Sequence, residues 1–205
     1  FYGVGPMGWN KDSINKRFNH LTNLYTDTAY YFITTDQGSG KAITQQSPIA
    51  GANVTVSSFN FYDVHDLELV NPATVGKNWY GETFISGNTS QTFPFDMGSP
   101  VSDVYCTVSF ASTSNIGGCS FNVTFNGNPI ASGNFPGATS SDYVMNLTSV
   151  SCTVTSSPQL ANVGITFFPL DGSGIGYLNY IEINARRALS ITGDQMNFRD
   201  WQSVG

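Results

Sequence analysis

Most of the chain alternates between apolar and polar residues with a period of two, which is typical of strands that bury one face in a sheet. Gly, Pro, Asn, Asp or Ser residues fill most of the gaps between these runs, as expected for turns. The strands expected are 29–35, 54–61, 65–70, 82–85, 91–96, 103–111, 119–126, 142–148, 150–155, 161–168 and 175–184. So many short, evenly spaced strands predict an all-β fold, a jelly-roll-like antiparallel β-sandwich.

Two segments depart from this alternation. Residues 12–24 place Ile14, Phe18 and Leu21 at the i, i+4 and i+7 positions of one helical face, and Ser13 could cap the first turn. Because the segment is short, a loop with one helical turn is an equal alternative. The strand at 54–61 changes phase at Ser57-Ser58, which is typical of a β-bulge.

The length and the ends of the chain bear on its organisation. A chain of 205 residues with this pattern predicts a single domain, with an N-terminal segment at 1–28, the sandwich at 29–185 and a C-terminal hairpin at 186–205. The first residue is not Met, no signal segment follows, and residues 1–6 have the pattern of a strand that began earlier. We therefore expect a piece of a longer protein, in which the hairpin leads to a further domain.

Composition narrows the class of protein. Charged residues are only 11% of the chain, against about 25% in an average soluble domain, while aromatic residues are 14%. The net charge of −6 and the lack of a basic patch argue against nucleic acid as a partner. No apolar run approaches the ~20 residues of a membrane span. Ser, Thr, Asn and Gly supply most of the polarity, and this favours an extracytoplasmic β-rich domain.

The three cysteines share strand faces with apolar residues. Cys106, Cys119 and Cys152 each fall in phase with flanking Val or Phe side chains, so all three are expected to point into the core. Buried thiols behave as small hydrophobes, and desolvation disfavours the reactive thiolate. We expect inert core thiols and no catalytic residue. One disulfide with one leftover thiol is the alternative, and the sequence does not choose the pair.

Few other residues form a pattern that carries chemistry. His20 and His65 are expected to be surface histidines. Asp63, Asp66 and Glu68 could offer oxygen ligands to calcium, but that ion takes roughly six to eight oxygens and the spacing is not that of a dedicated loop. The sequence therefore predicts no cofactor, with calcium as the open alternative.

Trp79 and Tyr80 form the sharpest candidate binding feature. An exposed aromatic pair would offer a platform for a sugar or a peptide, as in a carbohydrate-binding module. The alternative is a pair of core or sheet-edge aromatics, which are common in β domains. The sequence leaves both interpretations open.

Several segments, in order along the chain, resemble gingipain-related cysteine peptidases, and more closely the PorU-like sortases of the type IX secretion system. The first is Phe1-Tyr2-Gly3-Val4-Gly5-Pro6 with Trp9. The others are Asn23-Leu24-Tyr25-Thr26-Asp27-Thr28-Ala29-Tyr30-Tyr31-Phe32-Ile33-Thr34, Gly40-Lys41 with Ile43, Gly76-Lys77-Asn78-Trp79-Tyr80-Gly81-Glu82-Thr83-Phe84, Gly176-Tyr177-Leu178-Asn179-Tyr180-Ile181-Glu182-Ile183, and Arg187, Leu189, Phe198 and Arg199. Residues 100–170 match only as a β pattern.

The resemblance implies a β-sandwich domain just upstream of a caspase-like peptidase domain. Such proteins lie at the cell surface of Bacteroidetes-type bacteria, where they cleave sorting domains from exported cargo. The resemblance places the catalytic residues in the peptidase domain, so none is carried over to this chain. It implies an accessory domain that packs on the downstream peptidase domain or docks an outer-membrane partner of the secretion system.

Overall fold

The structure is a computed structural model that describes residues 7–23, 25–26, 28–40, 44–45, 47, 50–51, 54–74, 76–113, 118–137, 145–155, 158–169, 172, 174–191, 193–194 and 196–203. The predicted motif at residues 1–6 and the Lys41 and Ile43 positions lie outside the described residues, as does the first half of the strand predicted at 142–148.

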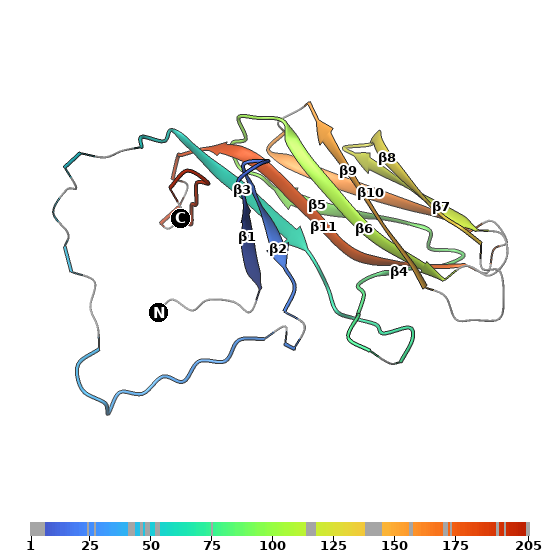
Figure 1. Ribbon diagram of the computed structural model, residues 1–205, viewed down its shortest axis with the longest axis horizontal. Coiled ribbons are helices and arrows are strands. Elements are labelled where there is room, and N and C mark those ends of the chain that lie inside the picture. The colour runs from blue at the N-terminus through green and yellow to red at the C-terminus, as the bar shows by residue number, and fades with distance from the viewer. Residues whose placement is uncertain are drawn as a thin grey trace.

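Two antiparallel sheets pack face to face (Figure 1). One sheet has the order β5-β10-β7-β8, from β5 (Ser90–Asp96), β10 (Leu160–Pro169), β7 (Cys119–Phe125) and β8 (Asn128–Phe135). The other has the order β3-β11-β6-β9, from β3 (Ser58–His65), β11 (Ile175–Ala188), β6 (Val104–Thr113) and β9 (Met145–Val154), and the short β4 (Thr83–Phe84) also pairs with β11. The predicted all-β sandwich is confirmed.

The core is a cluster of aromatic and branched side chains between the sheets. Phe110 of β6 lies at its centre, with its ring centroid 4.9 Å from that of Phe121, 5.0 Å from that of Phe84 and 5.7 Å from that of Phe167. All four rings are fully buried. Burial of one such side chain contributes roughly 1.5–3 kcal/mol, so this cluster is a major source of stability.

Two glycines leave room for these rings. A Cβ on Gly176 of β11 would lie 2.6 Å from Cζ of Phe110, and a Cβ on Gly133 of β8 would lie 2.2 Å from Cε1 of Phe121. Neither distance is possible between non-bonded carbon atoms. Each strand can therefore pack against its ring only because the residue at that point has no side chain.

The helix considered at residues 12–24 is wrong. β1 (Gly8–Asp12) and β2 (Arg17–Leu21) form an antiparallel hairpin instead. The Asp12 carboxylate accepts the backbone N–H groups of Ile14 and Asn15, at 3.1 and 3.0 Å, and so closes the turn. The backbone N–H and the side-chain amide of Asn15 are the main causes of the lowered pKa of Asp12, and the Ile14 N–H adds to them. Ile14 is 91% exposed, whereas Phe18 is buried against Tyr62 of β3.

Other expected strands are also corrected. No residue described in 28–40 belongs to a strand, although 29–35 has the densest β pattern of the chain. β3 begins only at Ser58, so the predicted run from Val54 and its bulge are wrong. Of the strand predicted at 65–70, His65 is the last residue of β3, and the rest contributes a single bridge, from Val70 to Tyr80. A strand exists only where a neighbouring strand accepts its backbone hydrogen bonds, which a local pattern does not reveal.

Three further differences concern β8, β9 and the tail. β8 was not expected, while the strands predicted at 142–148 and 150–155 are one continuous strand, β9. β11 continues to Ala188, and no residue described after it forms a strand, so a C-terminal hairpin is absent from that part of the chain. The tail is instead held on β3, where Asn60 donates its backbone N–H to the carbonyl of Arg199 at 3.0 Å.

Replacing Gly176 with Ala should destabilise the protein, because the added methyl group would overlap the Phe110 ring. Overpacking of this kind costs about 1–3 kcal/mol, measured as the free energy of unfolding in urea. Gly40→Ala is the matched control, since its Cβ would meet nothing within 4 Å. Equal stability of the two variants would contradict the packing described.

Candidate functional site

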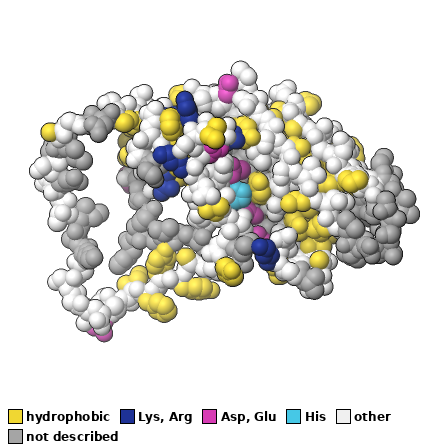
Figure 2. Space-filling view, in the orientation of Figure 1, with side chains coloured by type: hydrophobic (Ala, Val, Ile, Leu, Met, Phe, Trp, Pro, Cys, Tyr) yellow, Lys and Arg dark blue, Asp and Glu magenta, His cyan; other side chains and the backbone are white. Residues whose placement is uncertain are grey.

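The outer face of the larger sheet carries a buried cluster of polar side chains beneath the β1–β2 hairpin. Figure 2 shows Asp and Glu side chains gathered with a histidine on the face that carries this hairpin. The cluster consists of His20 from β2, Asp66 from the loop after β3, and Glu182 and Asn184 from β11. The side chains of His20, Asp66 and Glu182 are only 6%, 4% and 6% exposed.

An irregularity in β11 sets the direction of these side chains. The pairing register of β11 with β6 shifts between Leu178 and Tyr180, so Asn179 is an extra residue. Such a bulge reverses which residues face inward. Leu178 faces the core before the bulge, and Ile181 and Ile183 face it afterwards. Glu182 and Asn184 are therefore turned to the outer face.

Side chains of β11 accept backbone N–H groups of β2, as the backbone of a neighbouring strand would do. Glu182 Oε2 accepts the backbone N–H of His20 at 2.8 Å, and Asn184 Oδ1 accepts that of Phe18 at 3.3 Å. The same Glu182 oxygen lies 2.6 Å from Nδ1 of His20, while its other oxygen accepts the Asn184 side-chain amide at 3.0 Å. Buried polar groups need such partners, so these contacts hold the hairpin on the sheet.

The histidine ring is enclosed on its remaining sides. Its Nε2 lies 3.8 Å from Asp66 Oδ2, and Asp66 accepts the hydroxyl of Thr22 at 3.0 Å. The ring centroid of Tyr180 lies 4.3 Å from that of His20. Burial raises the pKa of Asp66 and that of Tyr180, and Glu182 raises the Tyr180 pKa further. Both ring nitrogens face carboxylates and the ring is shielded, so the cluster is suited to fastening elements together.

The prediction of surface histidines is wrong for His20, which is buried, and only partly right for His65, whose side chain is 28% exposed. His65 Nε2 lies 2.8 Å from Glu82 Oε1, and its ring packs on Phe93 with centroids 4.8 Å apart. The hairpin that covers His20 was not predicted. The alternation of Glu182 and Asn184 with Ile181 and Ile183 was the available sequence signal for this site.

The acidic residues considered for calcium do not converge. Asp63 accepts the backbone N–H of Val64 at 2.9 Å, whereas Asp66 turns towards His20 and Thr22. Across the described residues, no group of three or more His, Cys, Asp or Glu side chains could hold a metal ion.

The cationic side chains near the hairpin are also held by internal partners. The guanidinium carbon of Arg17 lies 3.7 Å from the ring centroid of Tyr105, and Arg186 pairs with the buried Asp200. Arg186 also donates to Asn60 Oδ1 at 3.0 Å. A depression of about 340 Å³ lies between these residues. The sequence pattern predicted the start of a C-terminal hairpin at residue 186, but not this contact between Arg186 and Asp200.

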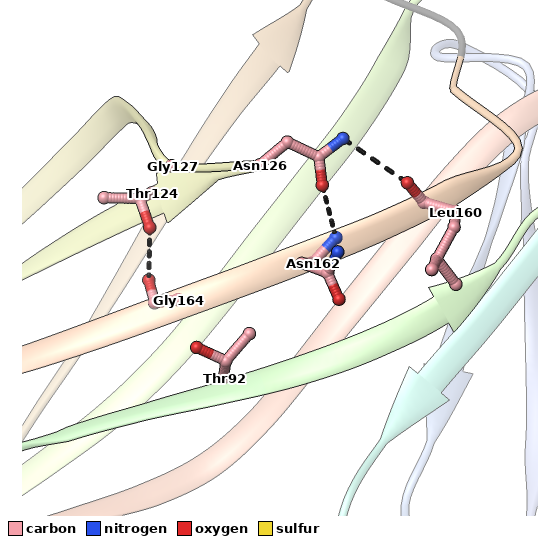
Figure 3. A pocket seen from close by; sticks show the side chains of 7 residues that line it. All are labelled: Thr92, Thr124, Asn126, Gly127, Leu160, Asn162 and Gly164. Carbon is pink, nitrogen blue, oxygen red and sulfur yellow. Dashed lines mark hydrogen bonds between the residues drawn. The ribbon is translucent and has the colours of Figure 1, made fainter.

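A second depression, of about 420 Å³, lies on the outer face of the smaller sheet (Figure 3). Its lining is uncharged and consists of Thr92, Thr124, Asn126, Gly127, Leu160, Asn162 and Gly164. Asn126 and Gly127 both have positive φ values and form the tight turn between β7 and β8, a strong hairpin signal in the sequence. The Asn126 amide spans to β10, where it accepts the Asn162 N–H at 2.7 Å and donates to the Leu160 carbonyl at 3.3 Å.

The structure separates the two residues of the proposed aromatic platform. Tyr80 is 5% exposed and packs against Tyr177, with ring centroids 6.0 Å apart. Its backbone pairs with Val70, which fixes the loop at this point. Trp79 is 45% exposed and is the member of the pair that a ligand could reach. Binding by Trp79 stays a prediction.

Comparison with known proteins gives a match of fold. The whole chain matches dimeric latent PorU from Porphyromonas gingivalis with a TM-score of 0.70 at 20% identity, and covers 20% of that chain. A CBM36 carbohydrate-binding module in complex with calcium and xylotriose matches with a TM-score of 0.40, at 15% identity over 62% of this chain and 99% of that one. A family 35 carbohydrate-binding module from an environmental isolate matches with a TM-score of 0.38, at 11% identity over 66% of this chain and 98% of that one.

No family model and no curated protein matches the chain. The likeness to the PorU region therefore concerns the β-sandwich fold. This chain spans about one fifth of the PorU chain. Within the described residues, no helix has the length and apolarity to span a membrane.

Replacing Glu182 with Ala should release the hairpin, because two buried donors lose their acceptor and His20 loses its carboxylate. We expect a loss of about 2–4 kcal/mol in the free energy of unfolding. The Trp9 ring, whose centroid lies 4.3 Å from that of Tyr62, should leave Tyr62, and its fluorescence should shift to the red. Asp194→Ala removes the same charge from an exposed position and should change stability by less than about 0.5 kcal/mol. Similar losses in both variants would show that Glu182 does not fasten the hairpin.

Proposed function

We propose that this chain is a non-catalytic accessory domain of a larger cell-surface cysteine peptidase of the gingipain-related sortase type. In this proposal the sandwich is a rigid scaffold, and an exposed segment docks it to a neighbouring domain of the same polypeptide. The sequence resemblance at both ends of the chain and the fold match to one fifth of PorU support this assignment. The peptidase activity and the cell-surface location belong to the proposed parent protein.

The observation that carries the proposal is the segment at 28–40. Tyr30, Phe32 and Ile33 are 82%, 99% and 65% exposed, although their side chains are among the strongest strand formers. In Figure 1 residues 28–40 lie away from the two sheets of the sandwich. Exposed apolar surface of this kind marks a site of protein contact.

The occupant that fits this segment best is the edge of a sheet in an adjacent domain. An extended run of aromatic and β-branched residues that forms no strand here can add to a sheet edge, where backbone hydrogen bonds give affinity and alternate side chains fill pockets. A neighbouring domain of the same chain is favoured because tethering raises its effective concentration.

The arrangement of titratable groups supports a non-catalytic role. His20 has both ring nitrogens directed at buried carboxylates, and Arg186 is paired with Asp200. Cys106 and Cys119 are buried, and burial raises the pKa of Cys106 to about 12. A nucleophile requires an accessible, activated group, and these side chains serve packing instead.

Hydrogen exchange tests the docking role by comparing this chain alone with the longer polypeptide that contains it. The backbone amides of residues 28–40 should exchange rapidly in the isolated chain and at least about tenfold more slowly in the parent, since strand pairing protects them. Phe32→Lys in the parent should restore rapid exchange, whereas Ile14→Lys, at the exposed hairpin turn, should not. Protection that an added outer-membrane partner alone induces, or equal exchange in both proteins, would overturn docking within the chain.

A second candidate function, the binding of neutral glycans, is favoured by the uncharged depression on the smaller sheet. Amide and hydroxyl groups of Asn162 and Thr92 could exchange hydrogen bonds with sugar hydroxyls. If this function is correct, a glycan array should show binding that Asn162→Ala weakens about tenfold. Loss with Trp79→Ala alone would assign binding to the Trp79 loop, and a blank array would exclude the function.

A further inference from the structure

We propose that Cys106 and Cys152 form a cross-strand disulfide when the folded protein meets a disulfide donor, and that Cys119 remains a thiol. The three cysteines are free in this structure. This modification site is independent of the proposed function, because it rests on the geometry of the larger sheet alone.

The pairing of β6 with β9 brings the two thiols together. Cys106 lies directly opposite Cys152 in the antiparallel register, between the Val104–Val154 and Val108–Val150 pairs. Directly opposed residues have Cα atoms about 4.5–5.5 Å apart and side chains on the same face. That separation lies within the roughly 4.4–6.8 Å that disulfides span. The two groups also interact electrostatically, since Cys152 contributes to the raised pKa of Cys106.

The surroundings of Cys119 exclude it from this pair. It lies on β7 in the other sheet, and the residue opposite it on β8 is Phe135. Its sulfur lies 3.1 Å from the hydroxyl oxygen of Ser112, in a buried position. The choice of pair that the sequence leaves open is therefore made by strand register.

The difference in exposure between the two thiols determines which of them reacts first with the disulfide donor. Cys152 is half-buried near the sheet edge, so its thiolate attacks the donor, such as oxidised glutathione, and one glutathione thiolate leaves. The Cys106 thiolate then attacks the Cys152 sulfur, the S–S bond forms, and the second glutathione leaves. Two thiol protons are released to solvent, the protein loses two electrons, and the donor gains them.

The bond would close the chain between β6 and β9 into a loop that includes β7 and β8 of the opposite sheet. A loop of this length removes much of the freedom of the unfolded chain. It would also fasten β9, which pairs only with β6 among the described strands. In the oxidising, extracytoplasmic setting that the composition favours, the sandwich would then resist the loss of this strand.

The test treats the folded protein with oxidised glutathione at pH 7 and pH 9 and then blocks the remaining thiols. Free thiols should fall from three to one, the mass should drop by two hydrogen atoms, and peptide mapping should join Cys106 to Cys152. The reaction should be faster at pH 9, because burial raises the pKa of Cys106 to about 12 and little thiolate is present at neutral pH. The melting temperature should rise by about 5–15 °C and return on reduction.

Two variants give matched controls. Cys119→Ala should still form the bond and gain the same stability, whereas Cys152→Ser should form no internal disulfide and gain none. Three thiols left after treatment at pH 9, a lasting glutathione adduct on Cys152 with Cys106 free, or a bond to Cys119 would overturn the proposal.

Discussion

The packing of aromatic rings between the two sheets is the interaction on which the rest of the structure depends. Phe110 contacts rings from both sheets, and Gly176 and Gly133 leave the space that these rings occupy. Because alternate side chains of each strand fill this interior, the residues between them must face outward. The chemical difference between the two outer faces therefore depends on which residues each sheet presents there.

The two outer faces have different roles because of one bulge and one hairpin. The smaller sheet presents small uncharged side chains such as Thr92, Thr124 and Asn162 to solvent. On the larger sheet, the bulge at Asn179 turns Glu182 outward, where the β1–β2 hairpin covers it. Buried charge is costly unless it is paired and hydrogen-bonded, and the histidine and amide partners of Glu182 meet that cost. The buried carboxylate of Glu182 and the imidazole of His20 thus hold the hairpin on the larger sheet.

Two features are left unexplained by the packing of the sandwich. Tyr30, Phe32 and Ile33 are largely exposed and lie outside the core of the sandwich, which supports a partner that buries them. The Cys106 and Cys152 side chains lie at directly opposed positions of β6 and β9, between two pairs of opposed valines. The first feature supports a domain that works within a larger polypeptide, and the second supports a sheet that oxidation can lock.

The sequence by itself determined the fold class, most strands of the core and the inward direction of the cysteines, because a period of two needs only neighbouring residues. Tertiary structure decided the rest. Residues 29–35 have the strongest local preference but no neighbouring strand, while the Asn126-Gly127 turn brings β8 beside β7, where Gly133 leaves room for Phe121. The hairpin at Gly8–Leu21, the burial of His20 and the pairing of Cys106 with Cys152 depend on contacts between residues distant in the chain. No local pattern encodes such contacts, since they arise only from strand order and register.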